Sequence, residues 1–399
     1  MGGVGGRDSG VVVLGRTAAG PGPADAGGDL ITVAGDAHLA TIAPRQSGED
    51  QSCLLPNLLA YPGQAVVVDV DGRAYDATAA ARRALGQAVV RLDPFGVTGQ
   101  EPDALDPLDL LNGLAEPTAT SWCLDIAGLL SLRHYGGAGA DGADGEAFGL
   151  LAALIGYVHA APGLGTFDAL YQALHEEEFS HSIAVALDTA GKHLPAPSYM
   201  ELTSYLSRDE WLRTRILATL RSRFGALGTP EVRRSLSRTT VPLSGMGAGE
   251  PATVYLVLPA GQVAACSVLL RLWVGTLLLG TARARDRAAC PTLFLLDRCA
   301  DLGSFPLLEA LLTQGSGGAA RIWTFWRDVH QLRTTHPGRW REIISGCGAV
   351  QAFATRDAAA AAEAEALLGL PAGDVWSLGP ADQILRVDGT PRRARRLAP

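Results

Sequence analysis

The chain contains the segment Ala43-Pro44-Arg45-Gln46-Ser47-Gly48-Glu49-Asp50-Gln51-Ser52, which has the layout of a phosphate-binding loop but not its charge. The apolar run Leu39–Ile42 precedes it and is typical of a buried strand, and Cys53–Leu59 follows it and predicts the start of a helix. A strand, a glycine-containing turn and a helix in this order form the scaffold on which P-loops hold phosphate groups.

Two positions of this loop carry the wrong chemistry for a nucleotide. Ser47 and Gly48 fit the pattern, but Glu49 occupies the lysine position and Asp50 occupies the position of the magnesium-binding hydroxyl. A carboxylate ~4 Å from a phosphate costs ~4 kcal/mol at an effective dielectric of ~20. Lys192 is the only lysine of the chain, so no lysine near the loop can compensate. The segment therefore predicts the P-loop fold without its phosphate clamp.

The composition predicts a globular protein with a large core. The chain has 399 residues, of which 47% are hydrophobic and 19% are charged. Its net charge is -8, so any contact with nucleic acid has to be local. The six cysteines are scattered without a CxxC pair, and the eight histidines form no HExxH motif. We therefore predict no metal site and no catalytic residues, and expect no disulfide framework.

The order of apolar runs predicts an α/β fold with a helical insertion. Strand-like runs occur on both sides of a central region that has only helical periodicity. They are Leu30–Val33, Leu39–Ile42, Ala65–Val70, Val89–Asp93, Thr253–Leu258, Thr292–Leu296, Arg321–Phe325, Ala349–Phe353 and Ile384–Val387. We expect three parts: a flexible N-terminal segment over 1–29, a core domain made of 30–112 plus 250–399, and an inserted all-α domain over 113–249.

No segment predicts membrane insertion. The longest apolar run, Val263–Gly280, carries Arg271 in its middle and is interpreted as a buried helix rather than a membrane span. No signal peptide is visible at the glycine-rich N-terminus. The glycine-rich stretch Gly245–Gly249 is interpreted as a linker between the helical region and the next strand.

The order and spacing of several short pieces together resemble the type IV secretion coupling proteins, the TraG/VirD4 family of hexameric P-loop motors. The pieces that carry the resemblance span most of the chain. They are Ala43-Pro44, Ser47-Gly48, Leu54–Leu59, Val68–Gly72, Leu92–Pro94, Asp106–Leu108, Tyr255–Pro259, Leu295–Asp297, Leu302-Gly303, Gln331-Leu332 and the C-terminal end Ile384–Arg396. The resemblance implies a RecA-like P-loop NTPase core sheet with an inserted all-α domain.

The departures from the family pattern concern its catalytic groups. The family's loop lysine is Glu49 here, and the glutamate that follows the Walker B aspartate is Arg298, although Asp297 remains. The family's γ-phosphate-sensing glutamine is Arg327. The family's membrane helices before the first strand are missing. Phosphoryl transfer depends on positioning and electrostatics, so these losses together predict a pseudo-ATPase. Two interpretations of Asp297 stay open: it is a magnesium ligand, or it is an acid paired to Arg298 or Arg327. The second interpretation is favoured.

The resemblance implies a non-hydrolysing component of type IV secretion or conjugative transfer. Its implied partners are DNA, relaxosome proteins, secretion substrates, and motor subunits of the same or another chain. No cofactor is expected, and the location is the cytoplasm, at the inner face of the bacterial membrane if it acts with the secretion motor. One alternative is an active DNA-translocating ATPase that takes a lysine or arginine from a neighbouring subunit and uses ATP and magnesium. Another is an adaptor of a different mobile-element or defence system.

A run of arginines marks a candidate surface for DNA or an acidic partner. It lies between positions 208 and 238 and has Trp211 nearby. The leading candidates are Arg208, Arg213, Arg215, Arg221 and Arg223. A charge run on a helix is more often a solvated face, and that interpretation stays open beside DNA binding. The C-terminal arginines of 392–396 could also bind phosphates, or simply finish a strand.

The inverted charges also predict ion pairs inside the altered nucleotide site. Arg298 and Arg327 follow adjacent strands, whose carboxyl ends face the loop in this kind of sheet. We expect Glu49 or Asp50 to lie within salt-bridge distance of Arg298 or Arg327, with Asp297 sharing one of the two arginines.

Overall fold

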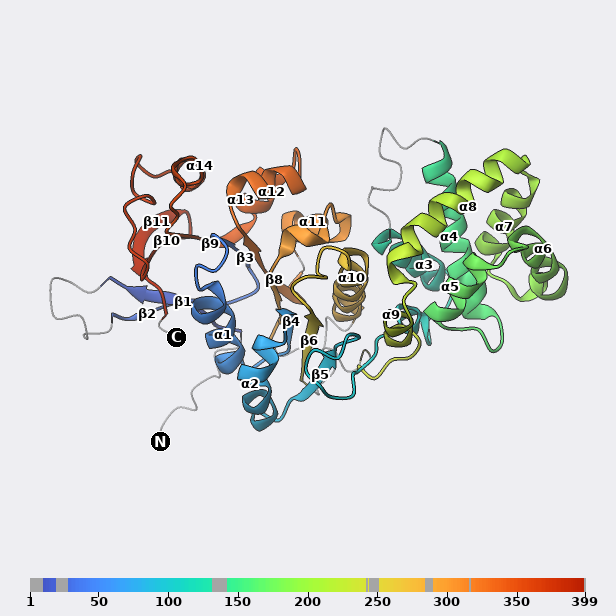
Figure 1. Cartoon of the computed structure of the whole chain (residues 1–399), viewed down its shortest axis with the longest axis horizontal. Coiled ribbons are helices and arrows are strands. Elements are labelled where there is room, and N and C mark those ends of the chain that lie inside the picture. The colour runs from blue at the N-terminus through green and yellow to red at the C-terminus, as the bar shows by residue number, and fades with distance from the viewer. Residues whose placement is uncertain are drawn as a thin grey trace.

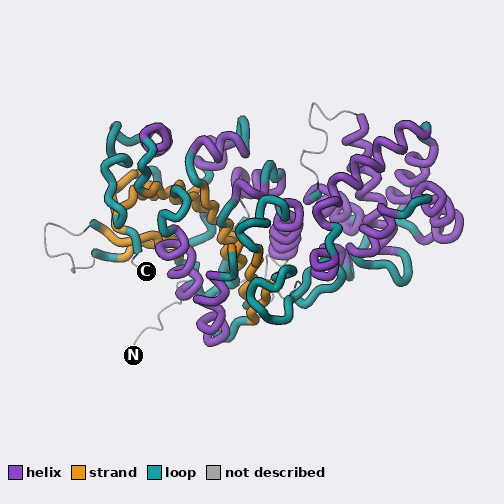
Figure 2. Tube along the Cα trace, in the orientation of Figure 1, coloured by secondary structure: helices purple, strands orange, loops and turns teal. Residues whose placement is uncertain are grey.

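The computed structural model describes residues 10–18, 28–130, 142–241, 243, 251–283, 290–315 and 317–397. Within these residues, a single sheet and a separate group of helices make up the molecule (Figures 1 and 2). The predicted linker Gly245–Gly249 lies outside the described residues.

Seven neighbouring strands of the sheet run parallel. In spatial order they are β5 (Ala88–Leu92), β6 (Ala252–Leu258), β4 (Ala65–Val70), β7 (Thr292–Leu296), β8 (Ala320–Trp326), β3 (His38–Ile42) and β9 (Cys347–Phe353). All residues of β3, β6, β7 and β8 are buried, as is typical of parallel strands covered on both faces. The α/β fold with a parallel core sheet, predicted from the sequence, is confirmed.

Four antiparallel strands extend this sheet beyond β9. They are β10 (Asp382–Val387), β11 (Thr390–Arg395), β1 (Val12–Thr17) and β2 (Leu30–Val33). The sequence interpretation of residues 1–29 as a flexible segment was wrong for β1, because Val12 and Leu14 are buried in the core. The rest of that segment that is described, Gly28 and the residues next to β1, continues this hairpin.

Helices cover both faces of the sheet. On one face lie α1 (Leu55–Ala60) and α2 (Arg73–Ala84), whose buried side chains share a core with β1. The other face carries α10 (Ser267–Arg283), α11 (Pro306–Gln314), α12 (Val329–Thr335), α13 (Trp340–Ser345) and α14 (Ala358–Leu368). Arg271 is buried in α10, and no helix among the described residues is long and apolar enough to cross a membrane.

The described chain between β5 and β6 contains helices and no strand. The helices are α3 (Thr118–Leu129), α4 (Gly142–Ala160), α5 (Phe167–His175), α6 (Phe179–Ala190), α7 (Ala196–Ser207), α8 (Glu210–Phe224) and α9 (Pro230–Ser235). All lie within the range 113–249 that the sequence predicts for the insertion. They gather at one end of the molecule, beside α10 (Figure 1).

Asp106 joins this helical group to the sheet domain. Its carboxylate accepts hydrogen bonds from the backbone N–H groups of Leu108 and of Phe167, the first residue of α5. Burial raises the pKa of the Asp106 carboxyl to about 7. The Asp106-Pro107-Leu108 piece of the family pattern therefore has a structural role at the base of the insertion.

Candidate functional site

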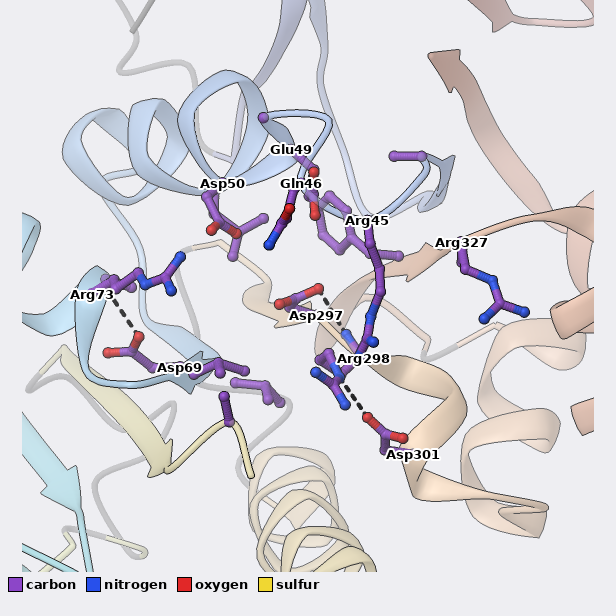
Figure 3. Close-up of a pocket in the computed structure, with 18 of the residues that line it drawn as sticks. Arg45, Gln46, Glu49, Asp50, Asp69, Arg73, Asp297, Arg298, Asp301 and Arg327 are labelled. Carbon is purple, nitrogen blue, oxygen red and sulfur yellow. Dashed lines mark hydrogen bonds and ion pairs between the residues drawn. The ribbon is translucent and has the colours of Figure 1, made fainter. Parts of the chain in front are cut away.

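The altered loop opens onto a pocket at the carboxyl ends of the parallel strands. The pocket has a volume of about 1080 Å³ and is bounded by the loop after β3 and by the ends of β4, β7 and β8 (Figure 3). Of the seven residues predicted for this site, it is lined by Gly48, Glu49, Asp50, Asp297, Arg298 and Arg327, whereas Ser47 is not among the lining residues. Parallel α/β sheets place their ligand crevice at this edge, so the topology brings the predicted residues together.

The loop contains two residues in left-handed backbone conformations. Gly48 has φ +88° and Gln46 has φ +59°, both in the left-handed region. The first helical turn, Asp50–Leu54, is a π-helix that continues directly into α1. The hydroxyl of Ser47 donates to Oε2 of Glu49 at 3.1 Å, which keeps this carboxylate close to its own loop.

Three carboxylates face the same part of the pocket: Glu49, Asp50 and Asp297 (Figure 3). Burial raises the pKa of the Asp297 carboxyl to about 7, and the charges of Asp50 and Glu49 add to this rise. Burial also raises the pKa of Asp50, again with a contribution from Glu49. The floor of the pocket is therefore acidic and repels further negative charge.

The predicted ion pairs between the loop and the opposite wall are wrong. Arg298 donates from Nε to Oδ2 of Asp301 at 2.6 Å, and Arg327 donates from Nε to Oδ2 of Asp328 at 2.8 Å. Asp297 accepts the backbone N–H of Arg298 at 2.8 Å rather than its guanidinium. Each arginine thus pairs with an acid one or three positions further along the chain, where little side-chain entropy is lost.

The backbone explains these orientations. Arg298 has φ +60°, and this left-handed turn directs its side chain toward Asp301 in the 3-10 turn Cys299–Leu302. Asp328 is the N-cap of α12 and accepts the N–H of Gln331, while the Gln331 side chain accepts the N–H of Arg327. The local acids at 301 and 328 were visible in the sequence and were the signal that the prediction overlooked.

Sequence reasoning missed the cations on the rim of the pocket. Arg45 and Arg73 are exposed and line it, and Arg73 lies 3.6 Å from Asp71. Asp69, at the end of β4, also lines the pocket but points its carboxylate at the backbone N–H groups of Ala74 and Tyr75, where it caps α2. Burial raises the pKa of Asp69 to about 6. The motif Asp69–Gly72 therefore starts a helix rather than completing a phosphate site.

The residues of the pocket do not match the donor set that a magnesium–nucleotide complex needs. A triphosphate requires a loop cation, and magnesium requires a hydroxyl at the next position, whereas both positions hold carboxylates. In the part of the chain that the structure describes, no group of three or more histidine, cysteine, aspartate or glutamate side chains could hold a metal ion.

The candidate arginine surface lies in the helical insertion, away from the pocket, and several of its members are used internally. Arg208 donates to both carboxylate oxygens of Glu146 in α4, and Arg223 pairs with Asp144 at 3.0 Å. Arg221 donates to the backbone carbonyls of Leu174 and Glu176 at the end of α5. Arg213 and Arg215 also lie on α8: Arg213 is half-buried, and Arg215 is exposed with its guanidinium 4.9 Å from the Trp211 ring centroid.

Comparison with protein families identifies the chain. Residues 7–369 match the family model described as type IV secretory system conjugative DNA transfer. The chain belongs to this family.

Curated members of the family are related at low identity. Protein VirD4 of Rhizobium radiobacter is 23% identical over 340 residues, which cover 83% of this chain and 48% of VirD4. The conjugal transfer protein TraG of Escherichia coli is 23% identical over 363 residues, covering 80% of this chain and 53% of TraG. The chain thus spans about half the length of the curated relatives it matches.

Solved structures share the fold. The bacterial conjugative coupling protein TrwBdeltaN70, in complex with sulphate, superposes with a TM-score of 0.69 at 11% identity and covers 90% of this chain and 85% of that one. TrwB in complex with ADP and Mg2+ gives a TM-score of 0.67 at 12% identity, covering 91% and 86%. VirB4 of Thermoanaerobacter pseudethanolicus gives 0.57 at 14% identity, covering 100% and 98%. These likenesses confirm the fold predicted from the sequence.

Proposed function

We propose that this member of the family is a non-hydrolysing, coupling-protein-like component of type IV secretion or conjugative transfer. It acts by binding DNA, substrate or motor partners. Membership of the family supports the transfer role. One observation carries the non-hydrolysing part: Glu49 and Asp50 occupy the phosphate-binding end of the loop and face Asp297 across the pocket.

The electrostatics of the pocket oppose a nucleotide. A triphosphate would bring several negative charges against three carboxylates, and each close pair costs ~4 kcal/mol at ~4 Å and an effective dielectric of ~20. The two arginines of the wall, Arg298 and Arg327, are already paired with Asp301 and Asp328. Protonation of Asp297 near pH 7 lessens the repulsion, and the rim arginines Arg45 and Arg73 are exposed, so that solvent and salt screen their attraction for a phosphate.

Binding is proposed to lie elsewhere on the chain. On α8, Arg215 is exposed with its guanidinium 4.9 Å from the centroid of the Trp211 ring, Trp211 itself is 65% exposed, and Arg213 lies half-buried between them in sequence. An exposed tryptophan with arginines suits a phosphate backbone or an acidic protein surface. Arg208 and Arg223 instead hold the helical insertion together.

Calorimetry with ATP and magnesium tests the non-hydrolysing role. We expect no binding by the parent below the millimolar range, and no ATP turnover with or without DNA. The matched control is the double variant Glu49→Lys/Asp50→Thr, which restores the lysine and the hydroxyl and should regain measurable binding. A micromolar dissociation constant for the parent, or ATP turnover on assembly with a partner, would overturn the proposal. Either result would favour the alternative of an active ATPase that takes a lysine or arginine from a neighbouring subunit.

A further inference from the structure

The C-terminal end of the sheet reaches the altered loop through one side chain. Arg396, directly after β11, donates from Nε and from one terminal nitrogen to Oγ of Ser52, at 3.0 and 2.6 Å. Its other terminal nitrogen donates to the carbonyl of Pro380 at 3.0 Å, and its guanidinium lies 4.1 Å from the centroid of the Phe353 ring. The Arg396 backbone N–H is fixed on the carbonyl of Ala381 at 2.9 Å. The guanidinium is thus held by three separate groups, and the backbone of Arg396 by a fourth.

Ser52 links Arg396 to the loop through its hydroxyl group. Its hydroxyl donates to the carbonyl of Gly48 at 2.7 Å while it accepts from Arg396. A Cβ atom at Gly48 would lie 2.7 Å from a terminal nitrogen of Arg396, closer than real Cβ atoms approach. Gly48 therefore serves two demands: its φ of +88° and the room that the arginine needs.

Arg396 acts from behind the loop. It is not among the residues that line the pocket, whereas Gly48 and Glu49 are. In P-loop proteins an anion bound at the helix N-terminus satisfies the loop's N–H groups and orders it. Here the front of the loop carries carboxylates, so an anion is disfavoured there and the order of the loop needs another source.

We propose that Arg396 is the positioning residue of this loop: through Ser52 and Gly48 it holds the turn in place without a nucleotide. The inference deepens the proposed function, because it names what replaces the phosphate in a loop that does not bind one. It also makes the C-terminal strand part of the altered site, although the strand lies more than 340 residues further along the chain.

Hydrogen exchange of the loop amides, measured on the full chain without nucleotide, tests the proposal. Arg396→Ala and Ser52→Ala should each raise exchange of residues 46–54 by about tenfold, as expected when a charge-assisted hydrogen bond is lost. The double variant should exchange no faster than the single ones, since both break the same link. Arg396→Lys keeps the charge but not the forked geometry and should be intermediate.

Arg392→Ala is the matched control, because Arg392 is an exposed arginine of the same strand. It should leave loop exchange unchanged. Unchanged loop exchange in Arg396→Ala would overturn the proposal, as would a rise of equal size throughout the sheet. If Arg396→Ala does not fold, Ser52→Ala and Arg396→Lys decide in the same way. ATP binding by the parent would refute the non-hydrolysing role, but it would not change what the hydrogen-exchange measurement says about Arg396.

Discussion

At the scale of single residues, the altered site is defined by repulsion between acids rather than by the ion pairs that the charge pattern predicts. Glu49 and Asp50 share the pocket with Asp297, and the two wall arginines pair locally instead. The observed pairing determines the effect expected of a lysine at position 49. With buried arginines opposite the loop, a lysine at position 49 would destabilise the fold, whereas next to two aspartates it should stabilise it.

We therefore predict that Glu49→Lys raises the free energy of unfolding by about 0.5–2 kcal/mol at pH 8, because it replaces a like-charge contact with an attractive one. Urea unfolding measures the change. Glu49→Gln, which removes the charge without adding a cation, should give about half of the gain. A loss of stability in Glu49→Lys would mean that repulsion from a nearby arginine, Arg396 behind the loop or Arg298 or Arg327 of the wall, outweighs the attraction of the two aspartates.

The second residue-scale prediction concerns pH. The pKa of Asp297 is raised from 3.8 to about 7 in the folded chain, so between these values the folded state binds more protons than the unfolded one. Its contribution to stability is therefore present at low pH and is lost as pH rises from about 4 to about 7. Asp297→Asn should flatten the fall in unfolding free energy across this window, measured by urea unfolding at pH 5 and pH 8. Part of the slope should remain, because Asp69 and Asp106 also have raised pKa values. An unchanged slope would contradict the raised pKa.

At the scale of elements, the arginines of the helical insertion divide into two groups. Arg208, at the end of α7, pairs with Glu146 of α4, and Arg223 of α8 pairs with Asp144 of α4. These two arginines therefore hold the helices together.

We predict that Arg208→Ala and Arg223→Ala each lower the free energy of unfolding by about 0.5–1 kcal/mol and leave any DNA affinity nearly unchanged. The double variant Arg213→Ala/Arg215→Ala should lower DNA affinity and reduce the salt dependence of binding. Fluorescence anisotropy with labelled DNA at two salt concentrations, beside urea unfolding, separates the groups. Equal loss of affinity in all three variants would mean that the whole arginine run belongs to the binding surface.

The elements also show what the sequence could and could not predict. The buried parallel strands were recognisable because runs such as Ala65–Val70 are apolar without alternation, a pattern that depends only on local burial. The direction of Arg298 was not, because it depends on a left-handed backbone turn at that residue. Arg396 lay within a basic run that was noted, but no spacing connects it to Ser52, and only the strand order brings them together.

At the scale of the whole molecule, the two ends of the chain complete one sheet. The strand β1 pairs with β11 and β2, and its backbone is also held by side chains from the core. Asn57 of α1 exchanges two hydrogen bonds of 2.8 Å with the backbone of Val13, and the side chains of Gln351 and Gln383 both donate to the carbonyl of Leu14. The apolar run Val11–Leu14 is short and lies among glycines, and its strand partners are distant in sequence, so the sequence does not predict an ordered strand there.

The last prediction follows from these long-range contacts. Removal of residues 1–17 deletes two buried side chains, Val12 and Leu14, and removes both hydrogen bonds of Asn57 to Val13, so that the buried Oδ1 of Asn57 loses its donor while Nδ2 keeps the carbonyl of Cys53. Each buried aliphatic side chain contributes about 1.5–3 kcal/mol, and an unsatisfied buried polar group costs about 1–3 kcal/mol. The expected loss of about 4–9 kcal/mol is comparable to the whole stability of a domain, so the sheet domain should unfold at low urea or fail to fold.

A shorter truncation that starts at Gly10 keeps every one of these contacts and serves as the control. Leu14→Ala, expected to cost about 2–4 kcal/mol, gives a measurable value if the truncated chain is insoluble. Parent-like unfolding of the chain that lacks residues 1–17 would show that β1 does not belong to the folded sheet and that the flexible segment expected from the sequence was the better description.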